Sequence, residues 1–132
     1  MTDPDSIRVF LHLLGVAGWV GGQIVMVGLL PLLRSLGPDV PRIEAVHFAR
    51  VAWPCFGLAV VTGIWSLFAV EIGDHDTGYL IALLVKLLLV GLSGVAAAVH
   101  ATTRSVALRG ATGALGGLAA LGALFVGAVL VT

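Results

Sequence analysis

One lysine, Lys86, lies inside one of the most apolar stretches of the chain, LIALLVKLLLVGLSGVAAAVH at positions 80–100. The six other Lys or Arg positions are all arginines. A lysine changes its protonation state readily when it is buried, whereas an arginine stays charged. Lys86 is therefore a candidate catalytic residue that acts by charge pairing or proton transfer. The alternative is an interfacial anchor whose long stem lets the ammonium reach the membrane surface.

A second candidate group lies in the first apolar stretch, where His12, Gly15, Trp19, Gly22 and Met26 recur at spacings of three and four residues. This is the period of one helix face. A neutral imidazole is a common metal ligand, the glycines leave room for a flat group, and the tryptophan forms a wall. The face therefore predicts a cofactor site at His12. The alternative is a hydrogen-bonded structural histidine.

Histidines and arginines also occur in pairs along the chain. Each of three histidines has an arginine three or four residues away. This spacing suits haem, because the imidazole ligates iron while the guanidinium pairs with a propionate. The pairs are Arg8 with His12, His47 with Arg50, and His100 with Arg104.

The composition places the chain among membrane proteins. Of its 132 residues, 59% are hydrophobic and 11% are charged, and the mean hydropathy is +1.11. A soluble domain has about 25% charged residues. The net charge is zero, so a nucleic-acid partner is not expected. One cysteine, Cys55, excludes a disulfide or a cysteine-based zinc site within one chain.

Four segments are long enough to cross a bilayer, which requires about 20 apolar residues. We expect one transmembrane domain over residues 1–132, folded as an all-α, antiparallel four-transmembrane-helix bundle. Ser6 or Asp5 is expected to cap the first helix, and Pro41 suits the first turn of the second. The predicted spans are 7–33, 46–70, 78–101 and 106–131.

The polar residues of the spans fall into groups according to their helix face and their depth in the membrane. Lys86, Ser93, His100 and Arg104 are predicted to form one polar stripe on the third helix, facing the bundle interior. Antiparallel neighbours then give two candidate clusters. The outer cluster is His12 with Lys86, and the inner cluster is His47 with Arg50 and His100.

Arginines set the expected orientation. Positively charged loops stay in the cytoplasm, and arginines border the segments 34–45 and 102–109, whereas the segment 71–78 is acidic. We expect a multi-pass protein of a bacterial-type plasma (inner) membrane, with those two segments cytoplasmic and both termini outside. Besides the lipid bilayer, we expect a homodimer, because GxxxG pairs occur on the first and fourth spans. The pairs are Gly18 with Gly22 and Gly113 with Gly117.

Three stretches together resemble a known family. LHLLGVAGWVGG (11–22) resembles the first-helix motif His-x-x-Gly-x-x-x-Trp-x-Gly-Gly of the copper-resistance protein D membrane domain and of HemJ-type protoporphyrinogen oxidases. RVAWPCFGLAVVTGIWSLF (50–68) resembles their second helix, with an arginine at its start and Thr-Gly near its far end. GYLIALLVKLLLV (78–90) resembles their third helix, with an aromatic residue at its start and a lysine one or two turns further on.

The resemblance implies roles for two residues. In HemJ-type proteins the histidine that corresponds to His12 ligates haem b, and the lysine that corresponds to Lys86 is functionally required. In the copper-resistance family the same scaffold is linked to copper handling. The chain departs from both patterns. It lacks the additional C-terminal span of the first type, and it lacks the methionines and histidines of a copper pathway, with only Met1 and Met26.

Three functions follow from these observations. The first is a haem b-binding protein with a redox or electron-transfer role, which would exchange electrons with a redox partner or a quinol. Whether such a protein is itself a haem-dependent oxidoreductase stays open. The second is a copper-binding or copper-transporting protein, for which Cys55 and Met26 are a thin supply of soft ligands. The third is a structural subunit of a membrane complex. The candidate cofactor residues are Arg8, His12, Gly15, Trp19, Gly22, His47, Arg50 and His100, with the three histidines as metal ligands.

Overall fold

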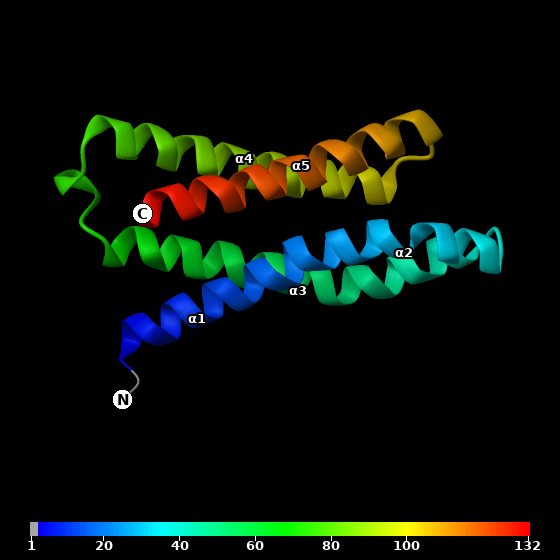
Figure 1. Cartoon of the computed structure of the whole chain (residues 1–132), viewed down its shortest axis with the longest axis horizontal. Helices are drawn as coiled ribbons and strands as arrows, with labels where there is room; N and C mark the ends of the chain where they lie inside the picture. Colours follow the sequence, from blue (N-terminus) through cyan, green and yellow to red (C-terminus); the bar gives the residue numbers. More distant parts are fainter. Residues whose placement is uncertain (1–2) are drawn as a thin grey trace. The chain divides into compact units, whose positions relative to one another are not determined.

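The computed structural model describes residues 3–132 and is all-α in that range, with four long helical segments and no strand. All four segments are apolar and long enough to cross a membrane. The prediction of an all-α membrane protein with four membrane-length helices is therefore confirmed. The chain divides at Val70 into two compact units, and each is an antiparallel helical hairpin (Figure 1).

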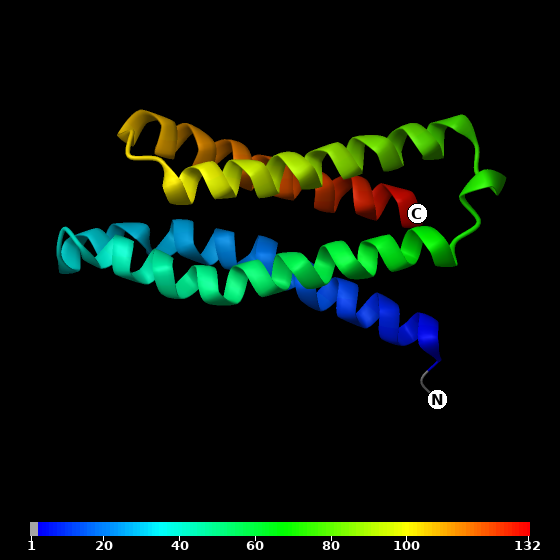
Figure 2. The same cartoon turned by 180° about the vertical axis from the view of Figure 1, so that it is seen from behind.

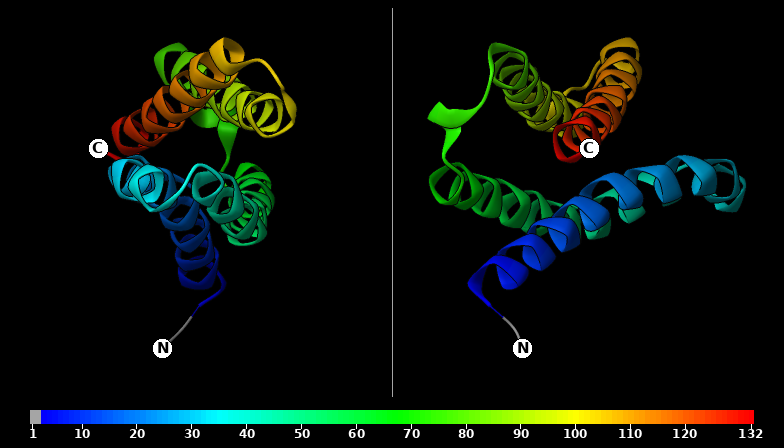
Figure 3. Two further views of the ribbon diagram at one scale, coloured as in Figure 1. Left: turned by 90° about the vertical axis from the view of Figure 1, so that its right-hand side faces the viewer. Right: turned by 60° about the vertical axis from the view of Figure 1, so that its left-hand side comes forward.

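The first hairpin pairs one composite helix with a second long helix. The composite helix is α1 (Pro4–Val16), the π-helical turn η1 (Ala17–Gly21) and α2 (Gly22–Leu36), which follow one another without a break (Figure 3). A short connection containing Gly37 leads into α3 (Val40–Ala69), which runs back along it. Gly37 has φ 155°, a conformation that favours glycine.

The second hairpin is α4 (Thr77–Thr102) followed by α5 (Val106–Val131), which lie side by side (Figure 2). The short 3-10 turn η2 (Ile72–Asp74) precedes it. Asp76 caps α4 by accepting the Tyr79 N–H, and Ser105 caps α5 by accepting the Leu108 N–H.

Three predicted details of the helices were wrong. Asp3, rather than Asp5 or Ser6, caps the first helix: its Oδ1 accepts the Ser6 N–H at 2.7 Å, and this bond lowers the pKa of the Asp3 carboxyl. The second helix begins at Val40 rather than near residue 46, with Pro41 in its first turn as predicted, since the break at 37–39 is enough to reverse the chain.

The third error concerns the polar stripe on the third long helix, whose end lies one residue from the predicted position 101. α4 ends at Thr102, and Thr103 is extended (φ −72°, ψ 142°) because the chain must turn before Ser105 caps α5. Arg104 therefore lies in the connection, and the predicted polar stripe of four residues cannot extend to it.

Small residues form the buried part of the second hairpin, the first also buries Trp19 and Val20, and many large apolar side chains of both hairpins point outward. Phe68, Val27 and Phe125 are 70–87% exposed in the isolated chain. A surface this apolar requires lipid rather than water around it. The chain is therefore a multi-pass membrane protein in contact with the bilayer. The buried positions of α4 and α5 are Ser93, Gly94, Ala96, Thr112, Gly116, Ala119, Ala120 and Ala123.

Candidate functional site

His12 is bound across the first hairpin. Its half-buried ring reaches from α1 to α3, where Nδ1 lies 3.0 Å from the Ala59 carbonyl oxygen and 3.0 Å from Thr62 Oγ1. Gly63 flanks the ring, because a Cβ at that position would lie 3.5 Å from His12 Cε1. Both residues of the Thr-Gly pair at 62–63 therefore contact the histidine.

These bonds determine which ring nitrogen carries the proton. A carbonyl oxygen only accepts hydrogen bonds, so Nδ1 must be the donor to Ala59. Thr62 uses its single hydroxyl hydrogen toward the Leu58 carbonyl at 2.6 Å, which leaves its oxygen to accept from His12. In the neutral imidazole the lone pair is then on Nε2. A metal ion would bind this nitrogen, because Nδ1–H is engaged in hydrogen bonds.

Arg8 lies one turn before His12 and is also bound to α3. Its side chain is only 12% exposed; Nη1 donates to Ser66 Oγ at 2.6 Å, and Nη2 donates to Asp5 at 3.2 Å. Within residues 3–132 its Nε is a buried polar atom without a hydrogen-bond partner. The Nε–H of the guanidinium is thus a buried, unused donor beside the hydrogen bonds that Ser66 and Thr62 form on α3.

The glycines of the first helix serve a different purpose from the predicted one. A Cβ at Gly15 would lie 2.6 Å from the Ala59 backbone nitrogen and 2.7 Å from the Cys55 carbonyl oxygen. A Cβ at Gly22 would lie 2.6 Å from the Phe48 ring. These glycines therefore let α3 approach closely, and α3 fills the space that was predicted for a flat group.

Trp19 lies in the π-helical turn and is buried, at 7% exposure. Its ring packs against two aromatic rings of α3, with centroid distances of 4.5 Å to Phe56 and 5.2 Å to Trp53. π-Helical turns often occur at functional sites. Here the wider turn accommodates an aromatic cluster two turns from His12.

His47 and Arg50 are exposed on α3. His47 Nδ1 donates to the Ile43 carbonyl of its own helix at 2.9 Å, and Arg50 makes no hydrogen bond or ion pair in the described chain. His47 and His100 belong to different hairpins, so their predicted pairing stays a prediction.

His100 connects α4 to α5 at the turn between them. Its Nδ1 donates to the Arg109 carbonyl at 2.7 Å, and its ring lies over Gly113, where a Cβ would be 3.1 Å from it. Arg109 donates in turn to the Thr103 carbonyl at 3.0 Å. His100 is exposed, and these bonds give it a role in closing the turn.

Lys86 lies on α4 against α5. A Cβ at Gly127 would be 3.2 Å from Lys86 Nζ and 3.4 Å from Cε, so the glycine provides the space that the lysine stem occupies. The side chain is half-buried, and over residues 3–132 it makes no hydrogen bond or ion pair. Lys86 and His12 belong to different hairpins, and their predicted proximity stays a prediction.

Two functional candidates, Thr62 and Ser66, were not predicted as site residues from the sequence, although Thr62 belongs to the Thr-Gly pair of the second-helix motif. Hydroxyl residues in apolar helices often bond only their own backbone, so neither stands out by type. Their spacing of four residues was the available signal, because it matches the spacing of Arg8 and His12 on the facing helix. Within residues 3–132, no three His, Cys, Asp or Glu side chains gather in a way that would hold a metal ion.

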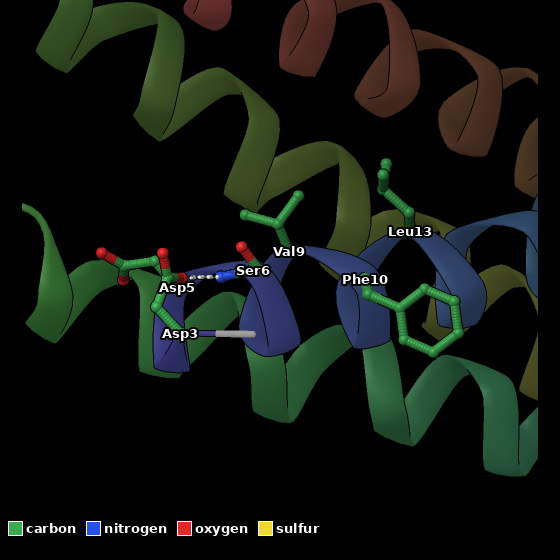
Figure 4. Close-up of a pocket in the computed structure, with 6 residues that line it drawn as sticks. All are labelled: Asp3, Asp5, Ser6, Val9, Phe10 and Leu13. Atoms are coloured by element: carbon green, nitrogen blue, oxygen red, sulfur yellow. Dashed lines mark hydrogen bonds between the residues drawn. The ribbon is translucent and has the colours of Figure 1, made fainter. Parts of the chain in front are cut away.

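A shallow surface depression lies on the first turns of α1 (Figure 4). It contains none of the predicted site residues, and a single helix with its cap lines it. Asp3 and Ser6 form the capping bond at its end. We therefore do not associate it with the His12 site. Its lining is Asp3, Asp5, Ser6, Val9, Phe10 and Leu13.

No known protein family, curated protein or solved structure matches the chain, so its function is inferred from these residues and from the motif resemblance alone.

Proposed function

We propose that the protein is a haem b-binding membrane protein with a redox role, in which His12 is an axial ligand. The observation that carries the proposal is the Nδ1 geometry of His12, whose two acceptors come from another helix. An Nδ1–H···O=C bond is the usual support of a ligating imidazole, because it fixes the tautomer and the ring orientation. His47 and His100 also bond carbonyls through Nδ1, but both are exposed.

The donor set around His12 fits haem in chemistry. The imidazole supplies a neutral nitrogen ligand, and the buried guanidinium of Arg8, with its unused Nε donor, supplies a partner for a carboxylate. A bound haem b would supply one-electron chemistry at its iron. Gly15 and Gly22 are left out of the proposed site, because their contacts with α3 use the space that a ring would need. Trp19 and Arg50 have no assigned part in it.

Lys86 is proposed to serve the same redox function by charge pairing or proton transfer. Its lack of an ion-pair partner within the described residues supports this role, since an unpaired ammonium in a membrane span costs about 2.5–3.5 kcal/mol on insertion scales. A residue kept at that cost is a functional candidate by default. A quinol is the proposed class of redox partner.

The proposed orientation follows from the charges at the helix ends. The segments 34–45 and 102–109, which the arginines border, are proposed to be cytoplasmic in a bacterial-type plasma membrane, and both termini are proposed to lie outside. The homodimer through GxxxG pairs stays a prediction.

An absorbance spectrum of the detergent-purified protein, expressed with adequate haem supply, tests the function. We expect a Soret band with reducible α and β bands, and a loss of at least about ten-fold in haem content for His12→Ala. His100→Ala is the matched control, since His100 also donates through Nδ1 to a carbonyl, and it should retain haem. Membrane insertion of each variant is checked by extraction and gel filtration.

Three results would contradict the proposal. Full haem content in His12→Ala would move the ligand to another histidine. Stoichiometric copper without a Soret band would favour the copper-binding function. The absence of both haem and copper from the wild type would favour a structural subunit.

A further inference from the structure

Thr62 is almost fully buried, at 2% exposure, and its hydroxyl makes hydrogen bonds both within its own helix and to the facing helix. Its hydroxyl donates to the Leu58 carbonyl at 2.6 Å, one turn back on its own helix. Its oxygen is also 3.0 Å from His12 Nδ1, on the facing helix. Because the only hydroxyl hydrogen is used toward Leu58, the oxygen presents a lone pair to the histidine.

A second buried threonine shows what is special about this arrangement. Thr112 of α5 makes the same bond to its own helix, with Oγ1 2.7 Å from the Leu108 carbonyl and 9% exposure. In the described part of the chain it makes no hydrogen bond to another helix. The bond to the preceding turn is therefore ordinary for a threonine in an apolar helix. The bond to His12 is what distinguishes Thr62.

We infer that Thr62 is a positioning residue for His12. Together with the Ala59 carbonyl, its lone pair holds the neutral imidazole in the Nδ1–H tautomer and fixes the ring plane, so that Nε2 carries the lone pair. The consequence for a bound iron rests on the proposed function. An acceptor on Nδ1–H makes the ligand more basic and stabilises the oxidised metal, which lowers the reduction potential.

The tautomer is measured on the protein without haem. Nitrogen-15 NMR of histidine-labelled protein in detergent, in alkaline buffer, gives the ratio of Nδ1–H to Nε2–H for His12. We expect Nδ1–H to predominate in the wild type. Thr62→Val keeps the shape but removes the acceptor, so the ratio should fall about two- to ten-fold, the equivalent of one net hydrogen bond.

Two further variants separate positioning from packing. Thr62→Ser restores the hydroxyl and should restore the wild-type ratio. Thr112→Val removes another buried threonine hydroxyl, in the second hairpin, and should leave the His12 signals unchanged. If Thr62→Val does not fold, as judged by circular dichroism, Thr62→Ala tests the same loss with a smaller side chain.

A wild-type ratio in Thr62→Val would overturn the inference, since the Ala59 carbonyl alone would then suffice. A lowered ratio in Thr62→Ser would overturn it as well, because the hydroxyl would not be the cause. With haem bound, Thr62→Val should have a higher midpoint potential than the wild type and Thr62→Ser should not. A wild type that binds no haem but gives the expected tautomer ratios would reject the proposed function and leave the positioning role standing.

Discussion

The two hairpins join their helices by different means. In the first, side chains of α1 donate across the interface, His12 to α3 at Thr62 and Arg8 to Ser66. In the second, glycines of α5 leave room for side chains of α4: a Cβ at Gly116 would lie 3.3 Å from the Ala96 methyl, and a Cβ at Gly122 would lie 3.2 Å from Leu89. Lipid provides no hydrophobic driving force, so helices in membranes associate by close packing or by polar bonds. Both hairpins pack closely at glycines, and the first adds bonds between side chains of its two helices.

This difference supports the placement of the proposed haem site in the first hairpin. The polar bonds of α1 and α3 fix the orientation of an imidazole and a guanidinium, the two groups that the proposed site uses. Lys86 is the exception in the second hairpin. It lies over Gly127 with no bonding partner in the described chain, so packing explains its space but not its charge.

Lys86→Met is expected to have the largest effect of the variants considered. It should raise the stability of the protein but slow the reduction of haem, so it separates packing from chemistry in the second hairpin. Loss of the ammonium should raise stability, since the wild type carries its insertion cost. Reduction of the bound haem by a short-chain quinol should slow about a hundred-fold, the lower range for loss of a proton-transfer group. Stopped-flow absorbance and unfolding in mixed detergent micelles measure the two effects.

Two variants serve as controls for the lysine. Gly127→Leu keeps the charge but fills the space beside Nζ, so it should slow reduction less than Lys86→Met while lowering stability. Lys86→Arg keeps a charge that does not transfer protons readily. If Lys86→Arg equals the wild type in both measurements, the lysine is an interfacial anchor and the second hairpin has no part in the chemistry.

A pair of glycine variants tests whether the first hairpin is also limited by close packing. The added Cβ of Gly15→Ala meets backbone atoms of Ala59 and Cys55 within 2.7 Å, and backbone cannot yield without separating the helices. We expect a loss of about 1–3 kcal/mol. The Cβ of Gly116→Ala meets the Ala96 methyl at 3.3 Å, which needs a shift of a few tenths of an ångström.

Gly116→Ala should therefore be nearly neutral, helped by the higher helix propensity of alanine, about 0.8–1.0 kcal/mol. Unfolding in mixed micelles, followed by circular dichroism, compares the two variants. An equal loss for both would mean that the two helix pairs tolerate added volume alike, and the contrast between the hairpins would then lie in their polar bonds alone.

Apolar length and helical period were enough to predict four helices, because lipid permits little else for such segments. Capping was less predictable: Asp3, Asp5 and Ser6 are all good N-cap residues, and only the structure selects Asp3. The start of α3 was placed six residues late, because the segment 34–45, which arginines border, was interpreted as a loop.

The residues of α1 that form the candidate site were predictable from the sequence, but their hydrogen-bond partners on α3 were not. His12 was singled out by its place on a periodic face, and its Nδ1 geometry supports that choice. The partners depend on which residues of α3 meet α1, and a backbone carbonyl such as that of Ala59 carries no sequence signal. The sequence does not show which residues of α3 lie opposite α1. For this reason Gly15 and Gly22 were predicted to leave space for a cofactor, whereas in the structure they allow α3 to approach closely.

The smallest expected effect separates two histidines that both bond a carbonyl. His100 joins α4 to α5 through the Arg109 carbonyl, whereas His47 bonds Ile43 of its own helix. His100→Ala should cost about 1 kcal/mol, because it removes a bond between helices, and His47→Ala should cost close to nothing, since the helix is retained without it. Protease sensitivity of the turn at 103–105 and unfolding in mixed micelles report the difference. Equal stability of the two variants would show that α4 and α5 are held by packing throughout, so that even the turn needs no polar bond.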